Sequence, residues 1–432
     1  MRVLISGAGI AGPVLAYHLS KGINAQVTVL ERAEKLLAQG QNIDIRGTAM
    51  KVIREMGLYD ELKKRNTTEI GCQFVTGKGK PIASFPVWIE GVETKCPSPT
   101  SEYEILRGDL ADMLYQATIH DSNIQYKFSV TVEKVLENTE DHVKVRLSNG
   151  EEIEYDVLVA ADGQWSKIRK QCFDEEDLQV VDKNMYIGYW TAPRDSSDND
   201  WWRIYHTTKS RLISLRPDPY GTIRPMFSKM PATEEEKEKW RKVSRSHDRA
   251  AQISLLKEEF ADAGYEADRL MKSLDTAEDF YFQAVSQIRM KKWSVGRVVC
   301  VGDAAYAPTP LTGMGTPLAI LGAYVLAGEL TSLKKGENPS GALKEYENAF
   351  KPFVAKIQDV PSFIPGVMHP KSSFGIGILH TVFWVLCKIF TQPFIARKFP
   401  EGEDEEDYKL KEYPILQQLA SKTKSTTTSE KA

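Results

Sequence analysis

Short, wholly apolar stretches open the chain and return at two later places. Residues 2–6 and 27–30 form the first two stretches, and 10–20 between them place small and apolar residues at helical spacing. Continuous apolar runs of this length around a helical pattern predict buried parallel strands in a βαβ unit. The same kind of run returns at 156–162 and at 297–302, where it precedes a glycine-rich loop and a long apolar helix.

The pattern changes between residues 173 and 290. Short segments rich in Tyr, Trp, Arg and Ile alternate with turns such as Pro217, Asp218, Pro219, which predicts an antiparallel sheet. An amphipathic helical stretch follows at about 234–274. Upstream, the spacing predicts a helix over 108–118 and a hairpin over 126–149 that ends in the turn at 148–150.

These elements predict an α/β fold, with a Rossmann-like nucleotide-binding domain, an inserted and mostly antiparallel β-sheet domain for substrate, and a C-terminal helix. The predicted divisions are the first part of the nucleotide-binding domain, the inserted sheet, the second part of the nucleotide-binding domain, a C-terminal apolar helix, and an acidic and disordered tail: 1–172, 173–290, 291–360, 361–396 and 397–432.

The apolar stretch at 374–390 leaves three interpretations open. As a helix it would be about 26 Å long, which is short for a membrane span, and it contains His380, Thr381 and Lys388. It could span a membrane, lie in a membrane interface, or bridge two domains. The residues after it are acidic at 401–407, and the last dozen are predicted to be disordered.

Composition excludes several classes of function. Hydrophobic residues make up 42% and charged residues 27% of the 432 residues, and the net charge of -3 creates no field for collecting nucleic acid. The five cysteines form no CxxC pair and are odd in number, so neither a disulfide framework nor a zinc site is expected. We expect a cytoplasmic protein without a targeting peptide, and a monomer is compatible with the sequence.

The first candidate site lies between the first strand and the first helix. Gly7 permits a tight turn, Gly9 lets the backbone approach a pyrophosphate, and Gly12 lets helix and strand pack closely. Glu31 ends the second strand, where a carboxylate can accept hydrogen bonds from ribose hydroxyls. Alone, this pattern predicts a dinucleotide without saying which one.

Two further segments follow buried strands. Asp162 and Gly163 come directly after the strand at 156–162, a pattern that also fits a simple turn with a helix cap. Gly302 and Asp303 end a later strand, where a carboxylate can bind a polyol chain. The loop after them opens a second helix whose amides could bind an anion, and its candidate residues are Pro310, Gly313 and Gly315.

Together the three segments resemble the flavoprotein monooxygenases of the para-hydroxybenzoate hydroxylase fold, including their tetracycline-inactivating branch. The resemblance covers roughly residues 1–395, and its most specific part is the stretch from Tyr281 that contains the GD segment in its expected surroundings. It implies that GAGIAG and Glu31 hold the ADP half of FAD. It also implies that DGxxSxxR at 162–169 supports FAD and NAD(P)H, and that Asp303 binds the ribityl chain.

The resemblance points to four more cofactor residues, which are Arg32, Asp44, Arg46 and Arg107. Many relatives have Gln where this chain has Met314, but the backbone amides of Gly313 and Gly315 remain available. In the tetracycline-inactivating branch a C-terminal helix bridges the two domains, which is the role implied for 374–390.

For activity, the resemblance implies that NADPH or NADH reduces the flavin, that oxygen adds at its C4a position, and that the hydroperoxide hydroxylates an aromatic or polyketide-like small molecule. No catalytic side chain and no metal ligand is required, because the cofactor does the chemistry. An FAD-dependent epoxidase or dehydrogenase of secondary metabolism remains an alternative, as does a non-catalytic binding protein of the same fold.

The inserted sheet is the expected site of substrate contact. Its aromatic and cationic residues could line a pocket, although half or more could simply pack in the core or face solvent. The residues selected for substrate contact are Trp190, Arg203, Arg216 and Arg224. The predicted partners are thus a small molecule and, if 374–390 is interfacial, a membrane surface.

Overall fold

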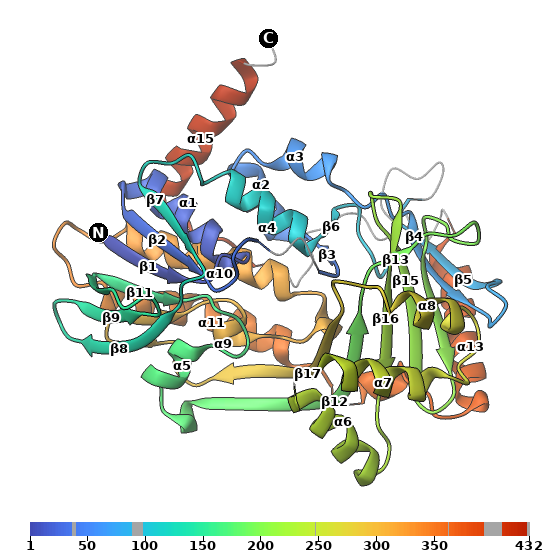
Figure 1. Ribbon diagram of the computed structural model, residues 1–432. Helices are drawn as coiled ribbons and strands as arrows, with labels where there is room; N and C mark the ends of the chain where they lie inside the picture. The colour runs from blue at the N-terminus through green and yellow to red at the C-terminus, as the bar shows by residue number, and fades with distance from the viewer. Residues whose placement is uncertain (37–39, 89–97, 247, 362, 393–407, 430–432) are drawn as a thin grey trace.

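The computed structural model describes residues 1–36, 40–88, 98–246, 248–361, 363–392 and 408–429 (Figure 1). Two sheets organise these residues. The first lies on the left of Figure 1 among the N-terminal strands, and the second lies on the right with helices packed over it. Candidate site residues lie on both sheets.

The first sheet has six strands in the order β18-β19-β11-β1-β2-β7. Neighbouring strands from β19 to β7 are parallel, and β18 joins antiparallel. The βαβ unit contains β1 Arg2–Ser6 and β2 Gln26–Glu31. The other strands of this sheet are β7 Ile124–Phe128, β11 Val157–Ala160, β18 Ser294–Val295 and β19 Val298–Cys300. The apolar runs therefore form a parallel sheet, as the sequence predicts.

Helices cover this first sheet. The long apolar helix α10 (Gly315–Thr331) packs against α1 (Ala11–Ile23) and α11 (Ser340–Gln358). Shorter elements around them are β3 Asn42–Asp44, α2 Gly47–Glu55, α3 Tyr59–Lys64, β6 Glu104–Leu106, α4 Arg107–Gln116, α5 Lys167–Cys172, η1 Glu175–Asp177, α9 Asp303–Tyr306 and η2 Pro310–Thr312. The hairpin predicted over 126–149 is shorter, because residues 126–128 belong to β7 of the first sheet. It consists of β8 Val132–Asn138 and β9 Val143–Leu147, which form a three-stranded sheet with β10 Glu152–Tyr155.

The second sheet is mostly antiparallel, in the order β17-β12-β16-β15-β14-β4-β5, with β13 paired to β16. Its strands are β4 Gly71–Val75, β5 Pro81–Pro86, β12 Leu178–Tyr189, β13 Ala192–Pro193, β14 Trp202–Thr207, β15 Arg211–Pro217, β16 Thr222–Lys229 and β17 Tyr281–Met290. One correction follows. Residues 71–86, assigned by sequence to the nucleotide-binding domain, supply two strands of this sheet through a parallel β14–β4 pairing.

The amphipathic stretch at 234–274 forms three helices, which are α6 Glu234–Ser246, α7 Arg249–Phe260 and α8 Ala267–Ser273. They cover one face of the second sheet. Phe227 from the sheet and Trp240, Leu256 and Phe260 from the helices are buried in one cluster between them. The helices therefore close that face, and α13 (Ser373–Phe390) packs on part of the opposite face, against β4, β5 and β14.

Two longer helices lie in the C-terminal region. After the short α12 (Ile364–Val367), helix α13 (Ser373–Phe390) packs against β5 and β14 of the second sheet. The tail predicted to be disordered contains α15 (Pro414–Ser429), which contacts α1 and α2. The acidic run at 401–407 lies outside the described residues.

Candidate active site

The candidate residues of the three segments emerge at one edge of the first sheet. Because β2, β1, β11 and β19 are parallel neighbours, their carboxyl ends lie side by side. Gly7, Glu31, Asp162 and Gly302 stand at those four ends. Ligands of open parallel sheets bind in the crevice outside the carboxyl ends of the strands, so this edge is the candidate cofactor site.

The first glycine loop has two packing positions and one open position. A side chain on Gly7 (φ +118°) would meet the carbonyl oxygen of Ala161 at 2.3 Å, and one on Gly12 would meet the carbonyl oxygen of Gly7 at 2.1 Å. A side chain on Gly9 would meet no atom within 4 Å. Helix α1 has no side-chain cap at Ile10. Its first amides are therefore left without a capping side chain, as at a helix start that binds an anion.

Glu31 holds the shape of this loop. One carboxylate oxygen accepts a hydrogen bond from the amide of Ala8 at 3.2 Å, and the other accepts one from the amide of Ala33 at 3.0 Å. A carboxylate offers about four acceptor sites, so the side chain can still accept hydrogen bonds from the hydroxyl groups of a ligand. Arg32 next to it is exposed.

The second segment contains a buried carboxylate with unused bonding capacity. Oδ2 of Asp162 accepts the amide of Lys167 at 3.0 Å, whereas its buried Oδ1 has no partner within the part of the chain that the structure describes. Burial raises the pKa of this carboxyl group. Gly163 has a φ of +81° and open space at the position of a side chain. An unpaired buried oxygen beside open space suits a ligand donor.

Arg169 ties the second segment to the third. Its guanidinium is buried and donates to the carbonyl oxygens of Ala304 at 2.6 Å and Gln164 at 2.7 Å. It is therefore occupied by backbone groups, and its direct role is to fix two loops relative to each other.

Asp303 begins α9 with an exposed side chain. Burial by the surrounding protein raises the pKa of its carboxyl group, and the charge of Arg107 opposes that shift. The carboxyl group is therefore accessible to a ligand at the candidate cofactor edge. The backbone turns sharply nearby at Thr309 (φ +93°), whose buried Oγ1 has no hydrogen-bond partner among the described residues.

The second glycine loop provides another uncapped helix end. Gly313 (φ +64°) and Gly315 have open space where a side chain would be, and Met314, the cap residue of α10, makes no side-chain capping bond. Pro310 is exposed at the start of η2. Two uncapped helix ends, four open glycines and an unpaired carboxylate oxygen together fit an elongated ligand that carries phosphates and hydroxyls.

Three further candidates divide into two groups. Asp44 accepts the amide and the hydroxyl of Ser101 at 2.9 and 2.8 Å, and Arg46 donates to the carbonyl oxygen of Pro99 at 2.8 Å. These two side chains are engaged with a neighbouring loop. Arg107, by contrast, is exposed at the start of α4 and acts on the charge of Asp303.

An aromatic pair of the second sheet lies near the cofactor edge. The rings of Tyr189 and Tyr281 are stacked with centroids 6.4 Å apart, and Tyr281 is 51% exposed. Burial by surrounding protein raises the pKa of Tyr281, while Arg107 and Arg32 lower it and Asp303 raises it. The pair therefore lies near the cofactor edge. The alternation of residues along β12 and β17 could have identified it, because both tyrosines lie on the face away from α6–α8.

Trp190 and Arg203, selected by sequence for substrate contact, are structural instead. Trp190 is 2% exposed, packs on Phe227 and donates to Ser273 at 3.0 Å. Arg203 is buried and pairs with Asp198. Both lie on the helix-covered side of the sheet, so the prediction of substrate contact was wrong for them.

Arg216 and Arg224 point away from the helices but are already paired. Arg216 donates two hydrogen bonds of 2.9 Å to buried Glu69 and also pairs with Glu104. Arg224 donates to Asp218 at 2.9 Å and Asp279 at 3.3 Å. A cation bound this way balances buried carboxylates, and the substrate contact predicted for these two is not supported by their geometry.

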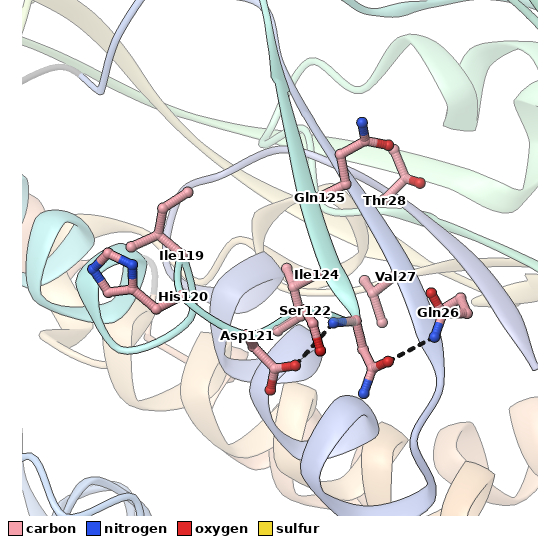
Figure 2. Close-up of a pocket in the computed structure, with 10 residues that line it drawn as sticks. Gln26, Val27, Thr28, Ile119, His120, Asp121, Ser122, Ile124 and Gln125 are labelled. Atoms are coloured by element: carbon pink, nitrogen blue, oxygen red, sulfur yellow. Dashed lines mark hydrogen bonds between the residues drawn. The ribbon is translucent and has the colours of Figure 1, made fainter.

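A separate hollow lies at the opposite edge of the first sheet (Figure 2). It encloses about 510 Å³ and is lined by Gln26, Val27, Thr28 and residues 119–125. Gln26 begins β2, whereas Glu31 ends it. The hollow therefore lies at the amino end of that strand and is not part of the candidate active site.

Comparison with known proteins gives consistent matches. A family described as "FAD binding domain" matches residues 1–360. The "Flavin-dependent monooxygenase eupH" of Phoma sp is 35% identical over 406 residues, covering 88% of this chain and 91% of that protein. The "Monooxygenase CTB7" of Cercospora beticola is 33% identical, covering 95% and 97%. The crystal structure of tetracycline destructase Tet(51) aligns with a TM-score of 0.75 and 25% identity, covering 95% and 99%.

Proposed function

The chain belongs to the family of FAD-binding flavin-dependent monooxygenases, and from this premise we propose that it uses NAD(P)H and O2 to hydroxylate an aromatic or polyketide-like small molecule. The observation that carries this proposal is the meeting of three chain segments at one sheet edge, opposite the Tyr189 and Tyr281 pair.

We assign the ADP half of FAD to the first segment. The amides at the start of α1 and the open position at Gly9 receive the pyrophosphate. Glu31 accepts the ribose hydroxyls, and Arg32 stands beside it. Asp162, which follows β11, would accept a hydrogen bond from FAD at its unpaired oxygen.

The flavin half belongs to the third segment in this proposal. Asp303 would accept hydrogen bonds from the ribityl hydroxyls, and the amides at Gly313 and Gly315, at the uncapped start of α10, would be available to the flavin ring. Arg107 balances the charge of Asp303. Asp44 and Arg46 act indirectly, because their side chains fix the loop that follows residue 98.

When bound, FAD supplies the oxygen-activating chemistry, with NAD(P)H as the reductant. The protein must hold the substrate beside the ring and exclude water. Tyr189, Met226 and Leu311 form an apolar cluster with buried residues of β12 and β17. Tyr281 is 51% exposed, and a tyrosine hydroxyl can donate a hydrogen bond to a substrate oxygen.

The proposed substrate class rests on this wall and on the relatives. Stacked tyrosine rings offer flat apolar surface to a planar ring system. The tetracycline destructases carry the name of a polycyclic compound, and a related polycycle fits the same kind of wall.

The test is a coupled assay with a panel of phenols and aromatic polyketides. We expect a substrate to accelerate both NAD(P)H oxidation and oxygen uptake, and mass spectrometry to detect a product heavier by one oxygen atom. Labelled O2 must supply that atom, because the oxygen of a hydroxylase comes from O2 and not from water. A product lacking two hydrogens would instead identify a dehydrogenase. Label from water, or hydrogen peroxide as the sole product with every substrate, would contradict the proposal.

A further inference from the structure

The outward face of α13 is apolar and uncovered by the described residues. Phe374 is 79% exposed, and five more large apolar side chains on this helix are between 41% and 53% exposed, which are Ile378, Val382, Trp384, Val385 and Ile389. Most recur at spacings of three or four residues, so they share one face of the helix. We call these six residues the outer face of α13. Scattered apolar residues on a surface are normal, but a continuous stripe marks an interaction site.

The inner face of the same helix is firmly attached. Phe383 stacks on Phe74 of β4 with ring centroids 3.9 Å apart. Cys387 accepts the amide of Ser84 at 3.3 Å and donates to its carbonyl oxygen at 3.1 Å. The helix therefore lies along the second sheet, at the right of Figure 1.

This attachment decides the orientation toward a bilayer. Among the described residues, α13 is the one candidate for a membrane span by helix length and composition. Its 18 residues would reach about 27 Å, slightly less than the roughly 30 Å hydrocarbon core. Crossing would also require the stacked and hydrogen-bonded inner face to leave the sheet. A helix held in this way can only lie flat, with its outer face toward the lipid.

The charge around α13 indicates which surface it meets. Among the described residues 363–392, the basic residues are Lys371 and Lys388 and there is no acidic residue, although acids outnumber bases 59 to 56 in the whole chain. Lys371 and Lys388 are exposed near the two ends of the helix. Trp384 is half exposed, and tryptophan favours the headgroup region. Basic residues around an apolar stripe match anionic lipid headgroups.

We propose that α13 docks this protein on an anionic membrane surface, with the helix parallel to the bilayer and its outer face among the acyl chains. A second copy of the chain is the main rival occupant. Two copies paired through this helix would bring lysines against lysines with no acidic residue of the segment to balance them, which disfavours that arrangement.

The experiment is vesicle flotation of the full-length, FAD-loaded protein. Vesicles of phosphatidylcholine alone are compared with vesicles that also contain phosphatidylserine. We expect binding to the mixed vesicles, weaker binding to phosphatidylcholine, and release as salt is raised, because salt screens the lysines. Val385→Glu should reduce partitioning to the mixed vesicles by about tenfold or more.

Two matched variants separate the contributions. Val180→Glu makes the same substitution at a valine that is 42% exposed on β12, away from α13, and should bind as the wild type does. Lys371→Glu with Lys388→Glu should remove the preference for phosphatidylserine. Flavin content and melting temperature verify that each variant is folded.

Wild-type protein that does not float with the mixed vesicles would overturn the proposal, as would a Val385→Glu variant that floats equally well. A concentration-dependent dimer that Val385→Glu dissociates, without vesicle binding by the wild type, would instead assign the outer face to a second copy.

Discussion

Some residues at the cofactor edge allow close backbone packing, and others leave space for a ligand. Gly12 allows close packing, because a carbonyl oxygen occupies the place of any side chain, whereas Gly9 borders open space. The glycine motif predicts close packing at Gly12 and clearance for a ligand at Gly9, and the distances agree with that division.

We therefore predict opposite effects of the same substitution at these two positions. Gly12→Ala should destabilise the protein by about 1–3 kcal/mol or more, because the new methyl group overlaps the Gly7 carbonyl. Gly9→Ala should fold with nearly wild-type stability but bind FAD about tenfold or more weakly, since the methyl group occupies the approach of the pyrophosphate.

Thermal unfolding of the apoproteins and equilibrium FAD binding measure the two effects separately. Equal stability losses in both variants would show that Gly9 also serves packing and would contradict its assignment.

The sequence does not predict which of the candidate arginines are paired in the folded protein. Arg203, Arg216 and Arg224 have the composition of a polar binding wall, but each pairs with an acid of the fold. Two of those acids are five or six residues away, and Glu69 is 147 residues away from Arg216. No pattern along the chain distinguishes a paired arginine from a free one, because the partner is chosen by the folded arrangement.

At the scale of elements, α13 is joined to the second sheet partly through histidines. His206 of β14 contacts His380 of α13 at 3.2 Å, and its ring stacks on Phe74. Burial, together with the charges of His380 and His369, lowers the pKa of His206 to about 3. The neutral form is thus the one that fits this interface.

This shift predicts a pH dependence of stability. An unfolded histidine takes up a proton near pH 6.5, whereas His206 resists protonation until about pH 3 in the folded protein. The contribution of this pKa difference to the free energy of unfolding is complete above pH 6.5 and is lost progressively as the pH falls below that value. His206→Phe keeps the aromatic packing but has no titrating ring. Between pH 7 and pH 5 its free energy of unfolding should fall by about 1–2 kcal/mol less than that of the wild type.

Urea unfolding at both pH values tests this expectation, with the exposed His120→Gln as the control that should follow the wild type. Parallel pH curves for wild type and His206→Phe would remove His206 as the titrating group.

Elements with a continuous apolar pattern were predictable, and those that depend on distant packing were not. The parallel strands and the glycine loops follow directly from the sequence. β4 and β5 joined the second sheet because β4 pairs with β14, more than a hundred residues later, and no local signal specifies that pairing. Helix α15 has a polar, threonine-rich sequence, and it is fixed by Tyr413 and Leu416, which are buried against the first half of the fold.

At the scale of the whole molecule, this C-terminal helix closes one side of the nucleotide-binding half. Tyr413 donates to Glu329 of α10 at 2.7 Å, and its ring fills the space where Gly328 has no side chain. Lys411 also pairs with Glu329 at 2.8 Å. The chain end therefore covers α10, whose other end carries Gly315 at the candidate flavin site.

Truncation before Lys411 should lower the melting temperature by at least a few degrees, because it exposes buried apolar surface and leaves Glu329 without its partners. Truncation after Lys422 retains Tyr413 and Leu416 and should melt close to the wild type. Differential scanning calorimetry compares the two, and equal melting temperatures would mean that α15 contributes no stability.

We propose that segments far apart in the chain build one FAD site in this protein. A titration of FAD into the apoprotein tests whether they do. We predict one FAD per wild-type chain, with binding weakened about tenfold or more by Asp162→Ala and by Asp303→Ala and unchanged by Val180→Glu. A wild-type chain that binds no FAD, or either aspartate variant binding as tightly as the wild type, would contradict the account.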